Sequence, residues 1–511
     1  MLPPLLLAMA AVVALPGSSR AASSVRLATA DTVVVAQGAD PTTMDPDQQR
    51  ETTTFNVLSH LYDPLIIRDT KNATKWDPVL ATSWKVLSST DVQFKLRTGV
   101  HFTDGSLFNA ATVKYNIDRI LGTLPGEKSQ PLASYQYTSL KSAKVINDST
   151  VDIITKTPDP LLYARLSALL MIPTNSVAKD PNALASKPDG TGPYTLVTWD
   201  RNNQVVMKAN PSYFRGAPKI ANVIFKDMPD DASRLAALQA GDVDVISNLP
   251  PTDIKAAEST GKAVAESVPS DRITSIWLDT LDVPQLKSPL VRQALNYAVD
   301  VPTIISKVMG GYALRTANIV PPYFTGYDKS VRPFAYNPTK AKQLLSKAGY
   351  PKGFSMTVMV PAGRYLLGTE VAQAVAGYLG KVGVDTKVDI VDFGVFAKDT
   401  QVRKIPAAFF AGWGENFFNP VDEMQVAIQC GTKGFSWYCN KSVDKAINAA
   451  ADTLSPAKEN AALASAQRQI QADPPFIYLF AYRDLYGVSK RLNWKPRSDE
   501  LIYMYEASLK S

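Results

Sequence analysis

The sequence predicts an α/β protein of more than one domain, and three observations support this. The chain has 511 residues, more than a single hydrophobic core ordinarily needs. In its second half, helical periodicity in Pro289–Asp300 and Thr369–Val382 alternates with strand patterns such as Phe354–Val360. In its first half, residues 80–119 change from a period of two to a helical period. Strands and helices that alternate in this way are typical of an α/β fold.

The composition fits a soluble globular protein. Hydrophobic residues make up 45% of the chain and charged residues 20%, with a formal net charge of +7. The positive charges are dispersed, without a Lys/Arg-rich block or a basic patch interleaved with aromatic residues. We therefore expect no nucleic-acid partner.

The first 21 residues predict a secretory signal peptide. Leu2–Pro16 is almost wholly apolar, and Ser19-Arg20-Ala21 offers a cleavage site between small residues. The apolar run is shorter than the roughly 20 residues that a membrane span requires. No cysteine lies near the cleavage site, so we expect a mature periplasmic protein without a lipid anchor.

Two cysteines, Cys430 and Cys439, lie close together in a polar loop. In an oxidising compartment such a pair predicts a structural disulfide, worth about 2–3 kcal/mol for a loop this short. Free thiols are the alternative. No further Cys or His accompanies the pair, so we expect no zinc and no other metal.

The first half reads as a short strand and helix, then a separable block, then a return to the first domain. In the block, Val92, Phe94 and Leu96 alternate with polar residues, and Val100 and Phe102 continue the sheet pattern. The predicted elements in order are strand Thr32–Ala36, helix Thr52–Tyr62, strands around Trp84–Val86 and Val92–Leu96, a helix capped by Asn109, two strands within Val145–Lys156, strand Ile220–Lys226, helix Asp231–Gln239 and strand Val245–Ser247. The glycines of Gly190–Tyr194 suit a backbone with unusual dihedral angles.

The second half adds further strands and helices to those already named. They are helix Pro338–Ala348, strand Val384–Ile390, strand Ala407–Ala411, helices Asp444–Leu454 and Pro456–Ala472, and strand Phe476–Phe480.

The residues do not predict a catalytic centre. His60 and His101 are the only histidines: we expect His60 to be a packing or surface residue and His101 to face solvent. Ser-x-x-Lys begins at Ser176, Ser442 and Ser455, but the Lys-Thr-Gly that a serine β-lactamase also needs is missing. We expect a binding protein rather than an enzyme. The alternatives are an extracytoplasmic serine-dependent hydrolase and a peptide-binding chaperone or scaffold.

Several motifs, in order, resemble the family 5 extracytoplasmic solute-binding proteins, which are the peptide, opine and nickel receptors of ABC importers. The resemblance runs from about Asp31 to Ala507. The motifs are Ala81–Trp84, Arg97–Gly105, Asn109–Arg119, Gly190–Tyr194, Pro289–Asp300, Asn337–Gly349 and Tyr438–Asp444. The resemblance implies a two-lobed periplasmic binding protein fold with an extra α+β domain inserted in the first lobe. It also implies no cofactor, an ABC permease in the inner membrane as partner, and ligand capture by hinge closure; we expect a monomer.

On this resemblance the domain limits follow. We expect residues 31–67, 188–275 and 486–511 to form lobe I, residues 68–187 its accessory domain, and residues 276–485 lobe II.

The resemblance places the ligand site at the loop Gly412–Pro420, which follows the strand Ala407–Ala411. Trp413 is expected to form a stacking wall. Peptide-binding members of the family anchor the ligand ammonium on an aspartate of this loop, but the matching position here is Asn416. An amide carries no charge, so Glu415 takes this role only if the register shifts by one. Asn419 is expected to cap the following helix.

Further contacts are expected from both lobes. The family often uses an arginine near Arg364 and Tyr365 for a ligand carboxylate, so Arg364 is expected to be either that contact or a surface residue. Gln49, Thr52 and Thr53 reach the cleft from the first lobe. The expected ligand is an oligopeptide, an opine or a sugar-like conjugate; nickel is disfavoured because neither histidine lies in the late loops.

Overall fold

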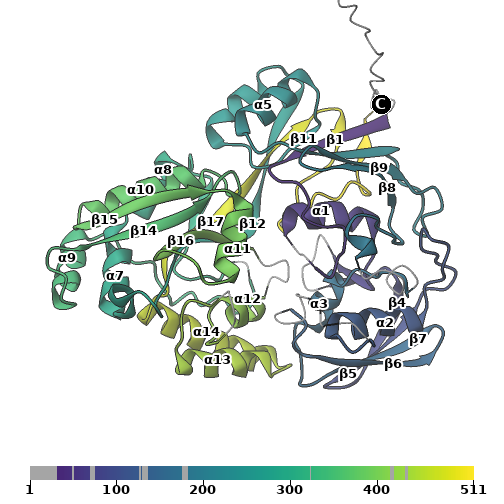
Figure 1. Ribbon diagram of the computed structural model, residues 1–511, viewed down its shortest axis with the longest axis horizontal. Coiled ribbons are helices and arrows are strands. Elements are labelled where there is room, and N and C mark those ends of the chain that lie inside the picture. The colour runs from purple at the N-terminus through teal and green to yellow at the C-terminus, as the bar shows by residue number, and fades with distance from the viewer. Residues whose placement is uncertain are drawn as a thin grey trace, which may run out of the picture.

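Two lobes joined by two long strands make up the protein (Figure 1). The computed structural model describes residues 31–48, 51–69, 75–125, 128, 130, 136–174, 182–322, 324–414, 419–431 and 436–510. The mixed α/β architecture and the two lobes agree with the predicted fold class.

A mixed sheet passes through both lobes. Within the described residues it has 11 strands, in the order β15-β14-β16-β12-β17-β11-β1-β10-β9-β8, with β13 paired to β17. In the first lobe these strands are β1 (Thr32–Gln37), β8 (Tyr194–Asp200), β9 (Gln204–Ala209), β10 (Asn222–Asp227) and β11 (Val245–Ile246). In the second lobe they are β13 (Ala313–Arg315), β14 (Phe354–Pro361), β15 (Val384–Val391) and β16 (Ala408–Gly414).

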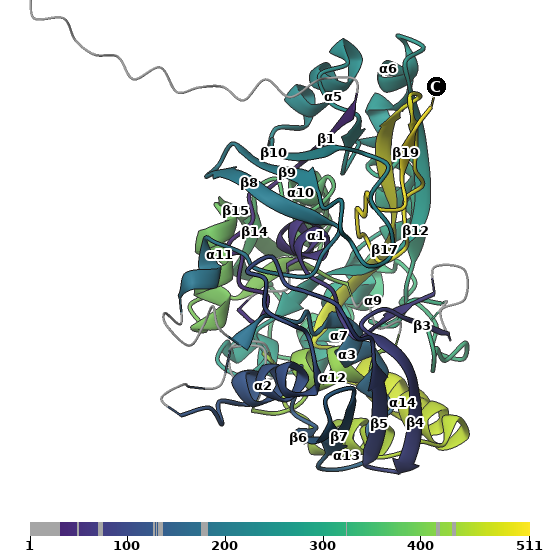
Figure 2. The ribbon, with the colours of Figure 1, turned by 90° about the vertical axis from the view of Figure 1, so that its right-hand side faces the viewer.

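The two lobes share the antiparallel strands β12 (Ala263–Leu278) and β17 (Phe476–Ser489). Their pairing shifts register between Pro269 and Ile273, where Ser270, Asp271 and Arg272 form a bulge. A bulge bends its strand and leaves residues unpaired in the ladder. We call residues 270–272 the hinge bulge. Figure 2 shows both strands beside the C-terminal segment, which ends in β18 (Leu492–Asn493) and β19 (Ser508–Leu509).

The accessory block contains a four-stranded sheet in the order β4-β5-β7-β6. Its hairpin β4 (Ala81–Ser88) and β5 (Asp91–Leu96) is the predicted one, and Phe94 is fully buried. The other elements on this side are α1 (Thr52–Leu61), β2 (Ile66–Arg68), β3 (Trp76–Pro78), α2 (Ala110–Leu121), β6 (Leu140–Asn147), β7 (Thr150–Thr155), α3 (Leu162–Ala168), α5 (Asp231–Ala240) and α6 (Ile254–Glu258). Asn109 caps α2 as predicted, accepting a hydrogen bond from the N–H of Thr112.

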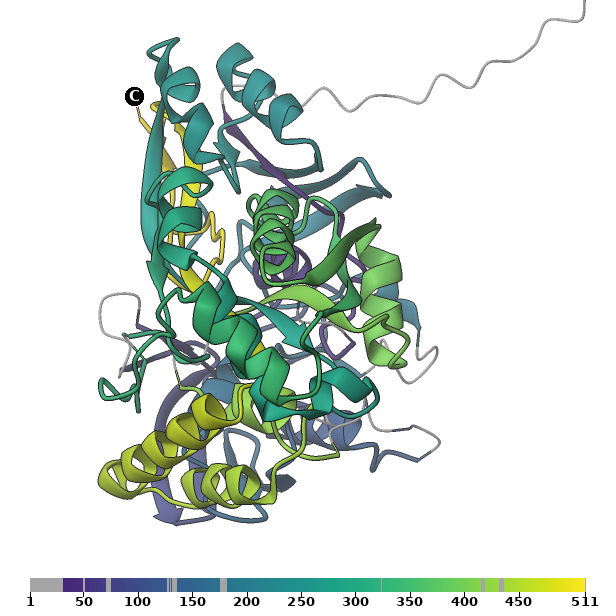
Figure 3. The same cartoon turned by 90° about the vertical axis from the view of Figure 1, so that its left-hand side faces the viewer.

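Helices cover the strands of the second lobe, which Figure 3 shows from its outer side. A core on one side of β14 and β16 includes Val358, Phe410 and Leu379. The helices are α7 (Pro289–Ala298), α8 (Val301–Lys307), α9 (Pro338–Lys347), α10 (Gly368–Gly380), α11 (Phe393–Gln401), α12 (Val421–Ala427), α13 (Lys441–Ala451) and α14 (Pro456–Ala472).

Three sequence predictions need correction. Val100 and Phe102 are buried but do not continue the sheet; His101 between them forms only an isolated bridge with Leu107. Gly190 and Gly192 do not adopt positive φ angles: they are glycines because a Cβ would lie 2.1 Å and 2.6 Å from the carbonyl oxygen of Leu61. The strand predicted over Phe476–Phe480 runs on to Ser489, because its polar continuation crosses between the lobes.

Candidate functional site

Residues predicted for the ligand site meet where the two lobes touch. Thr52 begins α1 on the first lobe, and Tyr365 lies between β14 and α10 on the second. The loop containing Tyr365 also contacts the first lobe through its backbone: a Cβ on Gly38 would lie 3.3 Å from the carbonyl oxygen of Gly363. The same loop holds Leu367 at a φ of 50°, which is uncommon for a residue other than glycine.

Arg272 of the hinge bulge connects these residues. Its guanidinium donates to Glu500 (Nη2 to Oε2, 2.6 Å), to the hydroxyl of Thr52 (3.3 Å) and to the carbonyl oxygen of Gly412 (2.7 Å). It also lies 5.9 Å from the ring centre of Tyr365. One arginine side chain therefore binds α1, the C-terminal segment and the end of β16. We call Arg272 and Glu500 the hinge-side contact.

The carboxyl groups around the hinge-side contact have pKa values shifted in opposite directions. Burial alone raises the pKa of Glu500, but the charge and hydrogen bonds of Arg272 outweigh it and lower this pKa to about 2. Burial, followed by the charge of Glu500, raises the pKa values of Asp271 and Asp484 well above the usual range. Neither carboxylate oxygen of Asp271 has a hydrogen-bond partner among the described residues. Arg272 therefore stabilises the ionised form of Glu500, whereas burial and the charge of Glu500 disfavour the ionised forms of Asp271 and Asp484.

Arg364 is a half-buried cation at the cleft. Its guanidinium lies 5.1 Å from the ring centre of Tyr365 and 5.7 Å from that of Phe393. Its charge reaches Glu51, at the N-terminus of α1, and Glu500. Among the residues that the structure describes, Arg364 forms no ion pair, in contrast to Arg272. Such a guanidinium can bind a carboxylate through two parallel hydrogen bonds.

Trp413 lies at the end of β16, half-buried beside Trp277, with the ring centres 6.0 Å apart. The stacking wall predicted for Trp413 stays a prediction. On the opposite face of the strand, Gly412 lets Arg272 approach, since a Cβ there would lie 2.7 Å from Cδ of that arginine.

The remaining predicted site residues divide into two groups. Gln49, Glu415 and Asn416 lie outside the described residues. Thr53 is half-buried, and its carbonyl oxygen accepts a hydrogen bond from Gln37. Asn419 accepts a hydrogen bond from the N–H of Val421 at the start of α12, as expected for a cap.

A buried ion pair between the two lobes connects α3 to α12. Nη2 of Arg165, on α3, is 3.1 Å from Oδ1 of Asp422, on α12. Within its own lobe, Arg165 also pairs with Asp159 (3.3 Å) and donates to the carbonyl oxygen of Gln136. We call Arg165 and Asp422 the accessory-side contact. Apolar residues of the first lobe, such as Leu161 and Ala168, pack into the same core as Trp277.

The structure clarifies the other chemistry-bearing residues. His60 is fully buried: Nδ1 lies 2.6 Å from the carbonyl oxygen of Asn56, and Nε2 accepts from the N–H of Met504. Burial lowers its pKa to about 4, so it is a neutral packing residue. His101 is exposed. Cys430 and Cys439 form the predicted disulfide.

In the part of the chain that the structure describes, no helix has both the length and the apolar character that crossing a bilayer requires. No group of three or more His, Cys, Asp or Glu residues there is placed to hold a metal ion.

Sequence reasoning did not find Arg272, Glu500, Arg165 or Asp422. The available signal for Arg272 was Asp271-Arg272 directly before the apolar run Ile273–Leu278, which places charges on a strand. Its partner Glu500 lies 228 residues further along the chain, and no local pattern indicates that pairing.

Comparisons with known proteins point to one family. The model described as bacterial extracellular solute-binding proteins, family 5 (middle) matches residues 75–435. The glutathione-binding protein GsiB of Escherichia coli O6:K15:H31 is 30% identical over 481 residues, which cover 91% of this chain and 91% of the relative.

Solved structures show the same fold. The periplasmic binding protein DppA from Helicobacter pylori, solved with the peptide STSA, has a TM-score of 0.86 at 24% identity and covers 94% of this chain and 98% of its own. The oligopeptide-binding protein AppA from Bacillus subtilis, solved with a nonapeptide, has a TM-score of 0.85 at 23% identity, covering 94% and 99%.

Proposed function

The chain belongs to the bacterial extracellular solute-binding proteins of family 5, and from this premise we propose that it captures a short, peptide-like solute bearing a carboxylate and delivers it to an ABC importer. Binding takes place between the lobes, and the protein performs no chemistry on the solute. The observation that carries the proposal is Arg364, a half-buried guanidinium at the meeting point of the lobes that forms no ion pair among the described residues.

The ligand class follows from charge and from the relatives. A carboxylate that binds Arg364 replaces the water that this cation loses on closure, and charge-assisted hydrogen bonds are among the strongest in proteins. The relatives at 30% identity are glutathione-binding proteins. Glutathione, a tripeptide with two carboxylates, is therefore the first candidate; opines also carry carboxylates, whereas sugar-like conjugates without a carboxylate are less favoured because Arg364 needs an anionic partner.

Capture works by closure of the lobes. Arg364 and Trp413 belong to the second lobe, and Thr52 belongs to the first. A ligand that contacts both lobes favours the closed form, and its differential affinity sets how far the equilibrium moves. The proposed lobes are residues 31–67, 188–275 and 486–511 for the first, 276–485 for the second, and 68–187 for the accessory domain. The proposed mature protein is a periplasmic monomer without a lipid anchor, formed by cleavage after the signal peptide.

Native mass spectrometry of the protein purified from the periplasm tests this function. We expect a bound solute of a few hundred daltons that carries a carboxylate, and its addition to the emptied protein should raise Tm. Reduced glutathione, a dipeptide, an opine and a disaccharide form the comparison panel. Turnover of any of these would support the hydrolase instead, and stabilisation only by unfolded polypeptide would support the scaffold.

A further inference from the structure

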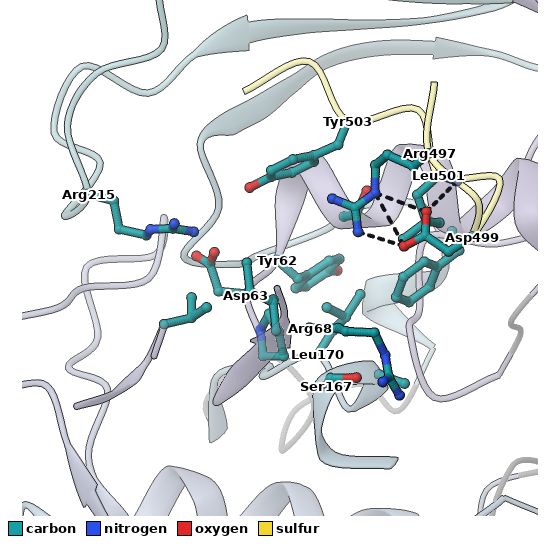
Figure 4. Close-up of a pocket in the computed structure, with 16 residues that line it drawn as sticks. Tyr62, Asp63, Arg68, Ser167, Leu170, Arg215, Arg497, Asp499, Leu501 and Tyr503 are labelled. Atoms are coloured by element: carbon teal, nitrogen blue, oxygen red, sulfur yellow. Dashed lines mark hydrogen bonds and ion pairs between the residues drawn. The ribbon is translucent and has the colours of Figure 1, made fainter. Parts of the chain in front are cut away.

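A pocket lies on the first-lobe side of the protein, apart from the cleft (Figure 4). Its lining comes from residues 55–68, 79, 167–170, 215 and 497–503, so α1, β2, the end of α3 and the C-terminal segment build it. The space between these residues is about 740 Å³ when the solvent at its mouth is included. Because none of this lining belongs to residues 276–485, the pocket does not need the second lobe to form.

The walls of the pocket are mainly apolar. Phe55 comes from α1, Tyr62 directly follows that helix, and Leu170 follows α3. Leu501 and the ring of Tyr503 line it from the C-terminal segment. When an apolar ligand enters this space, its surface is removed from water. The transfer is favourable by about 25 cal/mol per Å² of buried surface.

One end of the pocket offers a cation. In Figure 4 the guanidinium of Arg215 points toward Asp63 and the hydroxyl of Tyr503. Asp63 is already bound, accepting hydrogen bonds from Tyr213 (2.7 Å) and Thr191 (2.9 Å). Burial raises the pKa of Asp63 to about 6, above the usual value of an aspartate. Among the described residues, Arg215 forms no ion pair.

The pocket lining contains three other charged residues, Arg68, Arg497 and Asp499. Arg497 binds Asp499 through Nε (2.9 Å) and Nη2 (2.6 Å), which neutralises both. Arg68 also lines the pocket, stacked 4.3 Å from the ring centre of Trp76. The lining thus contains three arginines and two aspartates, and of these Arg215 is the cation on which the inference rests.

We infer that this pocket is a second binding site, for a small amphipathic carboxylate with an aromatic or branched apolar body, whose anionic end faces Arg215. Such a ligand differs from the polar, peptide-like solute proposed for the cleft. The site does not depend on that proposal, because the two share no lining residue. Two of its walls, α3 and the C-terminal segment, also carry Arg165 and Glu500. Binding of the cleft ligand is therefore measured for each pocket variant as well.

The test uses indole-3-propionate as the probe and tryptamine as a cation of similar shape, titrated into the full-length mature protein by calorimetry or ligand-observed NMR. Ser167→Trp fills the pocket from α3, and Ser442→Trp, on the exposed start of α13, is its matched control. Arg215→Gln removes the charge, and Arg332→Gln, at an exposed site of the second lobe, is the control for that change.

We expect saturable binding of one indole-3-propionate and none of tryptamine. Ser167→Trp should abolish binding and Arg215→Gln should weaken it at least tenfold, while both controls and the cleft variant Arg364→Gln bind as the wild type does. Retained binding of cleft ligand shows that the two pocket variants are folded. Binding that survives Ser167→Trp, that is lost in Arg364→Gln, or that never saturates would overturn the inference.

Discussion

Two buried arginines, Arg272 and Arg165, connect the lobes, and they differ in how each is held. On the hinge side, Arg272 binds Glu500, Thr52 and the backbone of Gly412, so it connects segments of both lobes at once. On the accessory side, Arg165 is fixed within the first lobe by Asp159 and reaches the second lobe through Asp422.

Breaking the two contacts should have different costs. Removing Glu500 from Arg272 would leave a buried cation without its carboxylate, which is very costly. If the lobes separate at Asp422, by contrast, Arg165 keeps a carboxylate partner in Asp159. We therefore expect the hinge-side contact to set stability and the accessory-side contact to set ligand affinity.

The largest effect is expected from Arg272→Gln. The substitution leaves Glu500 buried without its cation, and breaking a buried pair in this way costs about 3–5 kcal/mol. Chemical denaturation at pH 8 measures the free energy of unfolding. The exposed Arg332→Gln is the control, and a loss below about 1 kcal/mol would contradict the structural role of the contact.

The loss of stability caused by Arg272→Gln should depend on pH. In the wild type the pKa of Glu500 is about 2, so its ionisation contributes stability throughout the range from pH 4.5 to 8. Without Arg272, burial raises this pKa above the unfolded value, so that Glu500 in the folded variant takes up a proton as the pH falls. The loss caused by Arg272→Gln should then be smaller at pH 4.5 than at pH 8. An equal loss at both values would show that the charge of Glu500 is not what Arg272 balances.

The second-largest loss of stability is expected from removing the disulfide, which lies on the accessory side. Cys430 lies just beyond α12, the helix that holds Asp422, and its N–H donates to Asp444. Cys430 and Cys439 are separated by 9 positions, and opening a loop of this length costs about 2–3 kcal/mol. Thermal unfolding of the double Ser variant should show this loss. Reductant should lower the Tm of the wild type and leave that of the variant unchanged.

Asp422→Asn should give the smallest change in stability and a clear change in binding. Because Arg165 keeps Asp159, the free energy of unfolding should change by no more than about 1 kcal/mol, while ligand affinity falls about tenfold. Calorimetry with the cleft ligand measures this. Asp389→Asn, in the exposed ion pair with Lys387, is the control. The comparison fails if Asp422→Asn destabilises the fold as much as Arg272→Gln does.

Local patterns predicted most elements of the fold because period and caps are local properties of the chain. The hairpin of β4 and β5, the Asn109 cap and helices such as α14 all follow from them. The length of β17 could not be predicted from local patterns, because Arg483 and Asp484 end the apolar pattern. Their environment explains them: Nε of Arg483 donates to Ser267 on β12, and Asp484 belongs to the charged group around Glu500.

The candidate site was predicted in part. Thr52, Tyr365 and Arg364 lie where the lobes meet, and Trp413 ends the strand that leads into the predicted loop. The residues that connect them come from segments far apart in the sequence, such as Arg272 and Glu500. Long-range ion pairs have no periodicity, so the sequence could not place them.

Calorimetric titration of reduced glutathione into the wild type and Arg364→Gln tests the central claim most directly, with Arg364→Lys as the partial replacement. We expect one site in the wild type and an affinity at least tenfold lower in Arg364→Gln, because a hydrogen bond to a charged group contributes about 1.5–3 kcal/mol. Arg364→Lys should recover part of the loss, and the free energy of unfolding should stay unchanged. Equal affinity in the wild type and Arg364→Gln, or no binding of glutathione at all, would contradict a carboxylate-bearing peptide held at Arg364.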